Sequence, residues 1–175
     1  MANSLYTFRK AEEKDTERIW VIIKQAKAQM KRLGSCQWDE NYPAIETIQE
    51  DINRRDGYVI CLNDQVIAYG VISFDGEPVY EQIKDKWTNN LPYVIVHRLA
   101  VADEAKHQGV AKKFMLHAEE LSRSKGIYHF RVDTKYDNTY MLRLIDSLNF
   151  AYRGNVFYRN NTEERMAFEK RLCFI

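Results

Sequence analysis

The sequence lacks an excess of either charge, a long apolar run and a paired set of cysteines. Its 175 residues include 26 Lys and Arg against 25 Asp and Glu, so bulk electrostatics gives no case for nucleic acid or an anionic membrane as a partner. No apolar run approaches the about 20 residues that cross a bilayer. The first ten residues contain no signal-peptide core. We therefore expect a soluble, cytoplasmic protein.

Cysteine and histidine are also too sparse to form a framework. Cys36, Cys61 and Cys173 are odd in number and form no CxxC pair, and the four histidines show no metal-ligand spacing. We therefore expect neither disulfides nor a bound metal. No GxSxG segment indicates a serine hydrolase. Hydrophobic residues make up 45% of the chain, with no linker or low-complexity segment, so we expect 1–175 to form a single domain.

The apolar pattern predicts a mixed α/β fold. Apolar or β-branched runs predict strands at 5–9, 58–62, 66–72, 93–101, 130–133, 150–158 and 165–172. Apolar residues at helical spacing predict helices at 19–33, 45–52, 109–125 and 138–148. Residues 75–91 are interpreted as a loop with one helical turn. The order strand, helix, strand over 93–133 predicts one parallel crossover, with antiparallel hairpins on either side.

The most informative segment is KHQGVAK at 106–112, between a predicted buried strand and a predicted helix. The free N–H groups of a helix N-terminus attract anions, and Gly109 allows the backbone to approach a phosphate closely. The alternative interpretation is that Gly109 only shapes a tight turn and that the lysines around it form a solvated face. The strand–turn–helix context favours a pyrophosphate site instead. Neither a GxGxxG dinucleotide turn nor a Walker GxxxxGK[ST] turn is present.

With Leu99-Ala100-Val101 before it, this turn resembles the acyl-CoA signature of the GNAT superfamily of N-acetyltransferases, a strand ending in valine and then Q/R-x-x-G-x-G/A. The resemblance covers nearly the whole chain, because 138–150 is similar to the family's N-x-x-A…LYxxxGF stretch, and it extends to a poorly characterised bacterial branch. It implies a twisted mixed sheet flanked by helices, whose two central parallel strands splay around a pantetheine arm. It also implies that acetyl-CoA is bound by Leu99, Ala100, Val101, Lys106, His107, Gln108, Gly109, Val110, Ala111, Lys112, Asn138 and Met141.

Three positions depart from the family pattern, one of them Ala111, a common variant of the usual third-position Gly. Lys106 replaces the usual Gln or Arg, which keeps the charge but loses the planar fork. Ile145 stands where the family often has the tyrosine that protonates the departing thiolate. A thiol has a reference pKa of about 8.5, so a dedicated acid is less necessary for transfer. A non-catalytic acyl-CoA sensor is the alternative that Ile145 supports.

Polar side chains interrupt the two central strands, where both faces are ordinarily apolar. His97 is the predicted base because its ordinary pKa lies near neutrality. Asp133 and Tyr140 complete the predicted catalytic set. A satisfied core histidine and a buried Arg131–Asp133 ion pair are the alternative interpretations of these strand residues.

The predicted acceptor-binding residues are Trp87, Tyr93 and Arg131, with core packing as the alternative for the aromatic side chains. Trp38 is interpreted as core, while Tyr42 and Tyr80 are further candidates for the pocket wall. We expect direct transfer of an acetyl group from acetyl-CoA to a primary amine of a small molecule within a ternary complex. A protein N-terminus or lysine is the alternative acceptor, and a homodimer is compatible with the family fold.

Overall fold

The structure is a computed structural model of the chain, and it describes residues 5–173. A seven-stranded sheet has the strand order β1-β2-β3-β4-β5-β7-β6. The strands are β1 (Tyr6–Lys10), β2 (Gly57–Leu62), β3 (Gln65–Ser73), β4 (Val94–Val101), β5 (His129–Thr134), β6 (Ala151–Tyr158) and β7 (Glu163–Arg171). The α-helices are α1 (Thr16–Arg32), α2 (Ile45–Asn53), α3 (Val110–Ser124) and α4 (Thr139–Ser147). Three short 3-10 helices are η1 (Glu13–Asp15), η2 (Pro78–Lys86) and η3 (Asp103–Ala105).

The predicted mixed α/β fold is confirmed, with element ends shifted by a few residues. Asn63 and Asp64 form the predicted hairpin turn with φ values of 48° and 67°. The segment interpreted as a loop differs, because η2 occupies nine of its residues. Pro78 begins this helix and the Glu77 side chain accepts a hydrogen bond from the Val79 N–H. None of the helices in the described part of the chain is long and apolar enough to cross a membrane.

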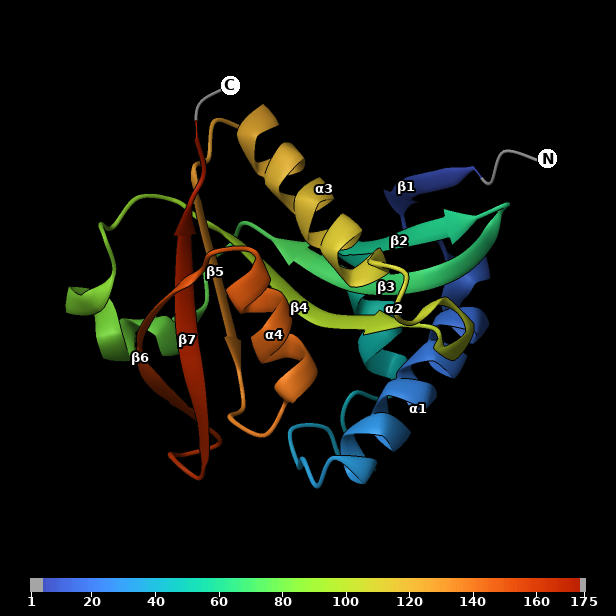
Figure 1. Ribbon diagram of the computed structural model, residues 1–175, viewed down its shortest axis with the longest axis horizontal. Helices are drawn as coiled ribbons and strands as arrows, with labels where there is room; N and C mark the ends of the chain where they lie inside the picture. The colour runs from blue at the N-terminus through green and yellow to red at the C-terminus, as the bar shows by residue number, and fades with distance from the viewer. Residues whose placement is uncertain (1–4, 174–175) are drawn as a thin grey trace.

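Strands β4 and β5 form the predicted parallel pair, but they pair only at Val94–Phe130 and Ile95–Arg131. Beyond these residues the strands diverge, leaving β1 to β4 on one side of a gap and β5 to β7 on the other (Figure 1). Arg98 has a φ of 52° at the point where the register between β3 and β4 shifts, which marks a β-bulge. After the bulge β4 still pairs with β3, so only its other edge faces the gap.

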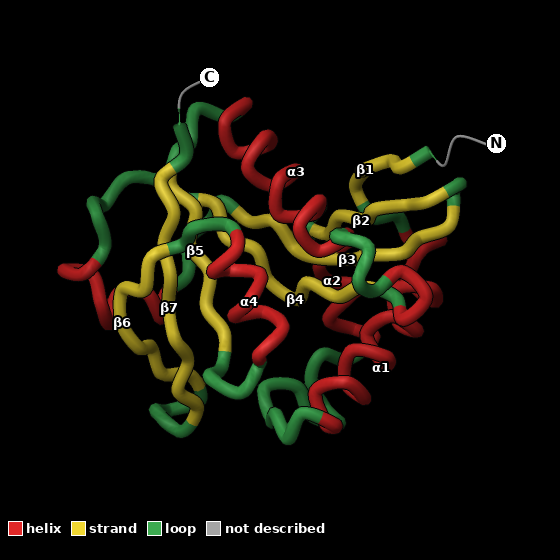
Figure 2. The backbone as a smooth tube through the Cα atoms, viewed as in Figure 1, coloured by secondary structure: helices red, strands yellow, loops and turns green. Residues whose placement is uncertain are grey.

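Helices cover both faces of the central strands, as the smooth backbone trace makes clear (Figure 2). Consecutive strand residues point to opposite faces, and Gly70 of β3 faces Phe114 of α3 while Tyr69 bonds to Asp51 of α2. Helix α1 contacts α2 as well as β3 and β4.

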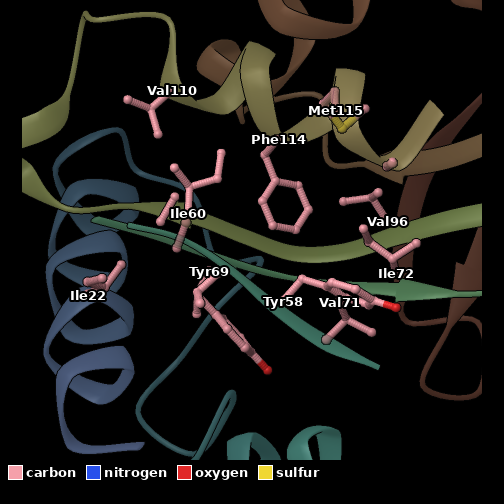
Figure 3. Close-up of a cluster of buried hydrophobic side chains, with 14 of the residues drawn as sticks. Ile22, Tyr58, Ile60, Tyr69, Val71, Ile72, Val96, Val110, Phe114 and Met115 are labelled. Atoms are coloured by element: carbon pink, nitrogen blue, oxygen red, sulfur yellow. The ribbon is translucent and has the colours of Figure 1, made fainter. Parts of the chain in front are cut away.

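The core between α3 and the sheet is closely packed. The Phe114 ring is fully buried and projects from its helix into a cluster that includes Ile60 and Val96 (Figure 3). A Cβ at Gly70 would lie 2.6 Å from the Cζ of Phe114, so the glycine is what admits the ring. This contact fixes α3, and with it the turn that begins α3, against the sheet.

Candidate functional site

A cavity of about 280 Å³ lies beside the free edge of β4. Eleven of the predicted cofactor-binding residues line it: Leu99, Ala100, Val101, Lys106, His107, Gly109, Val110, Ala111, Lys112, Asn138 and Met141. Helix α1 contributes Ala26, Gln29 and Met30, and its C-cap contributes Leu33; none of these four was predicted from the sequence. We call this space the donor cavity, and its lining brings together segments that are far apart in the sequence.

The turn before α3 has the features of an anion site at one end of the donor cavity. Gly109 is the N-cap of α3 with a φ of 72°, and a Cβ there would meet nothing within 4 Å. The first N–H groups of the helix have no partner within it, so they are free to bind an anion. The Lys106 ammonium is paired with the Asp103 carboxylate. The Gln108 side chain donates to the Glu104 carbonyl at 3.0 Å and does not line the cavity, which leaves only its backbone N–H for the predicted pyrophosphate contact.

Asn138 links the donor cavity to the end of β5. Its side-chain oxygen accepts a hydrogen bond from the Met141 N–H at 3.3 Å, which caps α4. Its amide donates to Gln37 Oε1, which also accepts from the Thr134 hydroxyl at 3.1 Å. Asn138 is therefore held in place on both sides while it lines the cavity.

A narrow space of about 50 Å³ continues from the donor cavity through the sheet. It shares Met30, Leu99, Asn138 and Met141 with the donor cavity. It shares Tyr42, His97, Arg98 and Arg165 with a second cavity of about 490 Å³. We call these spaces the passage and the acceptor cavity. Because neighbouring spaces share lining residues, the three lie in a row, with the passage in the middle, and we call this row the path.

The acceptor cavity is lined mainly by charged side chains. Its carboxylates are Asp51, Asp56, Asp75, Glu77 and Glu163, and its arginines are Arg54, Arg98, Arg159 and Arg165. Arg98 forms two hydrogen bonds to Asp51, at 2.9 and 2.5 Å, and a third to the Tyr42 hydroxyl. The Tyr69 hydroxyl donates to the same aspartate at 2.6 Å. This network satisfies the charge of a buried arginine at the bulge of β4.

Asp133 differs from its predicted catalytic role. Its carboxylate accepts hydrogen bonds from the hydroxyls of Tyr80 and Tyr158, at 2.8 and 2.9 Å, and from Arg165 Nη1 at 3.1 Å. Arg165 also bonds to Glu163 at 2.8 Å. With three hydrogen-bond donors on one carboxylate, Asp133 holds the side chains of Tyr80, Tyr158 and Arg165 in place.

His97 reaches both the passage and the acceptor cavity. Burial lowers its pKa to about 4, although Asp133 nearby opposes the shift, so the imidazole is neutral at pH 7. Its Nε2 lies 3.6 Å from Glu77 Oε2. Burial raises the pKa of the Glu77 carboxyl. Glu77 was not predicted from the sequence, where its one signal is a carboxylate directly before Pro78, at the start of a helix.

Tyr140 lies away from the reacting end of the path. It lines the donor cavity and a neighbouring space that also contains Lys106 and His107 of the anion turn, but it does not line the passage. Tyr140 therefore lies beside the turn predicted to bind pyrophosphate and not beside the passage, which differs from its predicted catalytic role. Ile145 is 1% exposed and belongs to the core, so nothing at that position reaches the cavity.

Trp87, Tyr93 and Arg131 do come together, but as a packed cluster and not as a pocket wall. The Arg131 guanidinium carbon lies 4.2 Å from the Trp87 ring centroid and 4.0 Å from that of Tyr93. Its Nε donates to the buried Glu169 of β7 at 3.1 Å. None of the three lines the donor cavity, the passage or the acceptor cavity, which differs from the predicted acceptor contacts. Arg131 also does not pair with Asp133, because each finds its partner on β7.

The family model for the acetyltransferase (GNAT) family matches residues 26–150. The chain belongs to the GNAT family. Solved structures agree: a GNAT acetyltransferase from Streptococcus agalactiae is 26% identical, with a TM-score of 0.85, and the match covers 98% of this chain and 100% of that one. A putative acetyltransferase from Staphylococcus aureus is 23% identical over 95% of this chain and 99% of that one, with a TM-score of 0.74. No curated protein sequence matches.

A more distant GNAT fold carries a ligand. A putative acetyltransferase from Salmonella typhimurium, described with its cofactor acetyl-CoA, is 15% identical over 97% of this chain and 95% of that one, with a TM-score of 0.68. The resemblance predicted from the sequence is confirmed, because the chain belongs to the GNAT family of acetyltransferases. Among residues 5–173 no group of three or more His, Cys, Asp or Glu side chains is placed to hold a metal ion.

Proposed function

We propose that this GNAT acetyltransferase transfers an acetyl group from acetyl-CoA to a primary amine of a small molecule, directly and within a ternary complex. The proposal rests on the arrangement of the donor cavity, the passage and the acceptor cavity in a row, with lining residues shared between neighbours. Donor and acceptor entering from opposite ends meet at His97 and Leu99. A sensor that only bound acyl-CoA would not need a second, charged cavity at the acyl end of the first.

The donor cavity divides into regions with different chemistry. The free edge of β4 at Leu99 to Val101 offers backbone groups to an extended amide chain such as pantetheine. The α3 N-terminus at Gly109 offers N–H groups to a pyrophosphate. Asn138 and Met141 line both the donor cavity and the passage, so they lie nearest the thioester end.

The charge of the acceptor cavity favours a cationic acceptor. Asp51 and Glu163 are neutralised by arginines, whereas Asp56, Asp75 and Glu77 have no Lys or Arg at ion-pair distance. Burial and the nearby Asp75 raise the pKa of Asp56. The unpaired carboxylates outnumber the one lining arginine without a partner, Arg54. A protonated amine entering this cavity therefore experiences a net attraction.

Amine-dependent release of free thiol from acetyl-CoA tests the proposal. The panel contains butylamine, 1,4-diaminobutane, lysine amide and a short peptide with a free N-terminus. We expect at least one cationic amine to stimulate thiol release, and we expect Asp75→Asn to raise its KM about fivefold, the effect of losing about 1 kcal/mol of attraction.

Asp85→Asn is the matched control, because Asp85 is an exposed carboxylate of η2 that does not line the acceptor cavity. Its KM should equal that of the wild type. Acetyl-CoA binding without thiol release by any amine would contradict the proposal and favour the sensor.

A further inference from the structure

We infer that Glu77 accepts the proton that the acceptor ammonium must lose, at a position facing His97. The inference rests on the proposed amine acetylation and assigns the proton acceptor of that reaction. An alkylammonium has a pKa of about 10, so at neutral pH almost none of the acceptor carries a free lone pair. A base at the passage therefore determines how fast the amine can react.

The other carboxylates near the passage either bind arginine or tyrosine side chains or lie away from His97. Asp51 is held by Arg98, and Asp133 accepts three hydrogen bonds. Glu163 is held by Arg165. The remaining lining carboxylates, Asp56 and Asp75, have no contact with His97, the residue that opens onto the passage. Glu77 alone among the lining carboxylates of the described chain lies next to that residue.

The backbone holds the Glu77 carboxylate in a fixed orientation. Its Oε1 accepts a hydrogen bond from the Val79 N–H at 3.4 Å as the N-cap of η2, and its own N–H donates to the Tyr93 hydroxyl at 3.1 Å. Its Oε2 is the oxygen that lies 3.6 Å from His97 Nε2. One oxygen therefore anchors the side chain and the other remains available to an ammonium or a bridging water.

The groups around Glu77 and its burial shift the pKa of its carboxyl. The charged and titratable groups around it, taken from every element that lines the acceptor cavity, are Tyr42, Asp51, Arg54, Asp56, Asp75, His97, Arg98, Asp133, Tyr158, Arg159, Glu163 and Arg165. Burial raises the Glu77 pKa, Asp133 adds to the shift, and Arg165 and Arg98 oppose it. A carboxyl with a raised pKa is a better proton acceptor near pH 7 than an ordinary one. Neutral His97 adds no positive charge beside Glu77.

The reaction then balances as follows. Glu77 takes one proton from the ammonium, and the nitrogen lone pair attacks the thioester carbonyl carbon. The C–N bond forms and the C–S bond breaks, and the sulfur leaves with the electron pair. The second nitrogen proton passes to the thiolate, and Glu77 returns its proton to water at the cavity mouth. The net products are the amide, the free thiol of CoA and one proton.

The pH dependence of kcat/KM tests this assignment on the full-length protein, using whichever panel amine the wild type acetylates. Glu77→Gln keeps the N-cap oxygen but removes the base. We expect it to lower kcat/KM at pH 7 about a hundredfold. We also expect its kcat/KM to rise about tenfold per pH unit from pH 7 to 9, as the free amine increases. The wild type should change little over the same range.

Glu81→Gln is the control, because Glu81 is an exposed residue of the same helix. Its profile should match the wild type, and acetyl-CoA titration and thermal unfolding should show all three proteins folded and donor-bound. A flat profile for Glu77→Gln with wild-type rates would overturn the assignment while leaving amine acetylation standing. A wild type that binds acetyl-CoA but acetylates no amine would instead overturn the proposed function and the assignment with it.

Discussion

His97 illustrates how the fold changes the chemistry of one residue. The sequence identified it as the best base because a free imidazole titrates near neutrality. Its position on β4, where the passage meets the acceptor cavity, lowers its pKa to about 4 and removes its charge at physiological pH. The proton-accepting role therefore moves to Glu77, whose pKa burial shifts upward. Desolvation disfavours the charged form of either group. It lowers the pKa of the histidine, whose basic form is neutral, and raises the pKa of the glutamate, whose basic form is anionic.

The lowered pKa of His97 predicts an acid-sensitive contribution to stability. Below the unfolded-state pKa of 6.5, the unfolded chain binds a proton at His97 that the folded chain does not bind until about pH 4. Stability is therefore lost as the pH falls through this window. Between pH 7 and 4.5 we expect the wild type to lose about 2 kcal/mol more unfolding free energy than His97→Gln. Urea unfolding at the two pH values measures this difference, and equal losses would contradict a buried, neutral His97.

At the scale of elements, the predicted helices and strands were recovered because each buries a regular apolar face. Helix α3 and strand β4 follow directly from such periodicity. Two features that shape the site were missed. Helix η2 has few apolar residues, and its position depends on packing against β6. The bulge at Arg98 places a non-glycine residue at positive φ, which is sustained by its bonds to Asp51 and Tyr42 and not by any local pattern.

The contact between Gly70 of β3 and Phe114 of α3 predicts that one added methyl group at Gly70 lowers the free energy of unfolding. In Gly70→Ala the new methyl group would lie 2.6 Å from a fully buried aromatic ring that has no room to move. We expect a loss of about 1–3 kcal/mol in unfolding free energy, measured by urea unfolding. Adding Phe114→Leu removes the ring. The loss of unfolding free energy in the double variant should therefore be smaller than the sum of the losses in the two single variants. Additive losses would show that Gly70 and Phe114 are not in conflict.

At the scale of the whole molecule, the site is a path assembled from distant segments. The sequence identified the donor half well, because the anion turn and the strand before it are contiguous in the chain. The acceptor half gathers Glu77, His97 and Arg165 from three separate elements, and only the folded sheet brings them together. Arg131 shows the converse, since it lies two residues before Asp133 on the same strand, and nothing in the sequence reveals that Glu169 of β7 is its partner. Contacts between strands far apart in sequence carry no local signature.

The central claim is that the turn before α3 binds acyl-CoA, and calorimetric titration with acetyl-CoA tests it most directly. Gly109→Trp places a large side chain where the backbone must approach the pyrophosphate. Gly126→Trp is a matched control, because Gly126 also has a positive φ, 71°, and open space at its Cβ, but lies at the other end of α3. Both variants should therefore have similar backbone strain, about 1 kcal/mol.

We expect the wild type and Gly126→Trp to bind acetyl-CoA alike and Gly109→Trp to bind at least a hundredfold more weakly. If Gly109→Trp bound acetyl-CoA as tightly as the wild type, the donor would not bind at this turn. A wild type that does not bind acetyl-CoA would contradict the account as a whole.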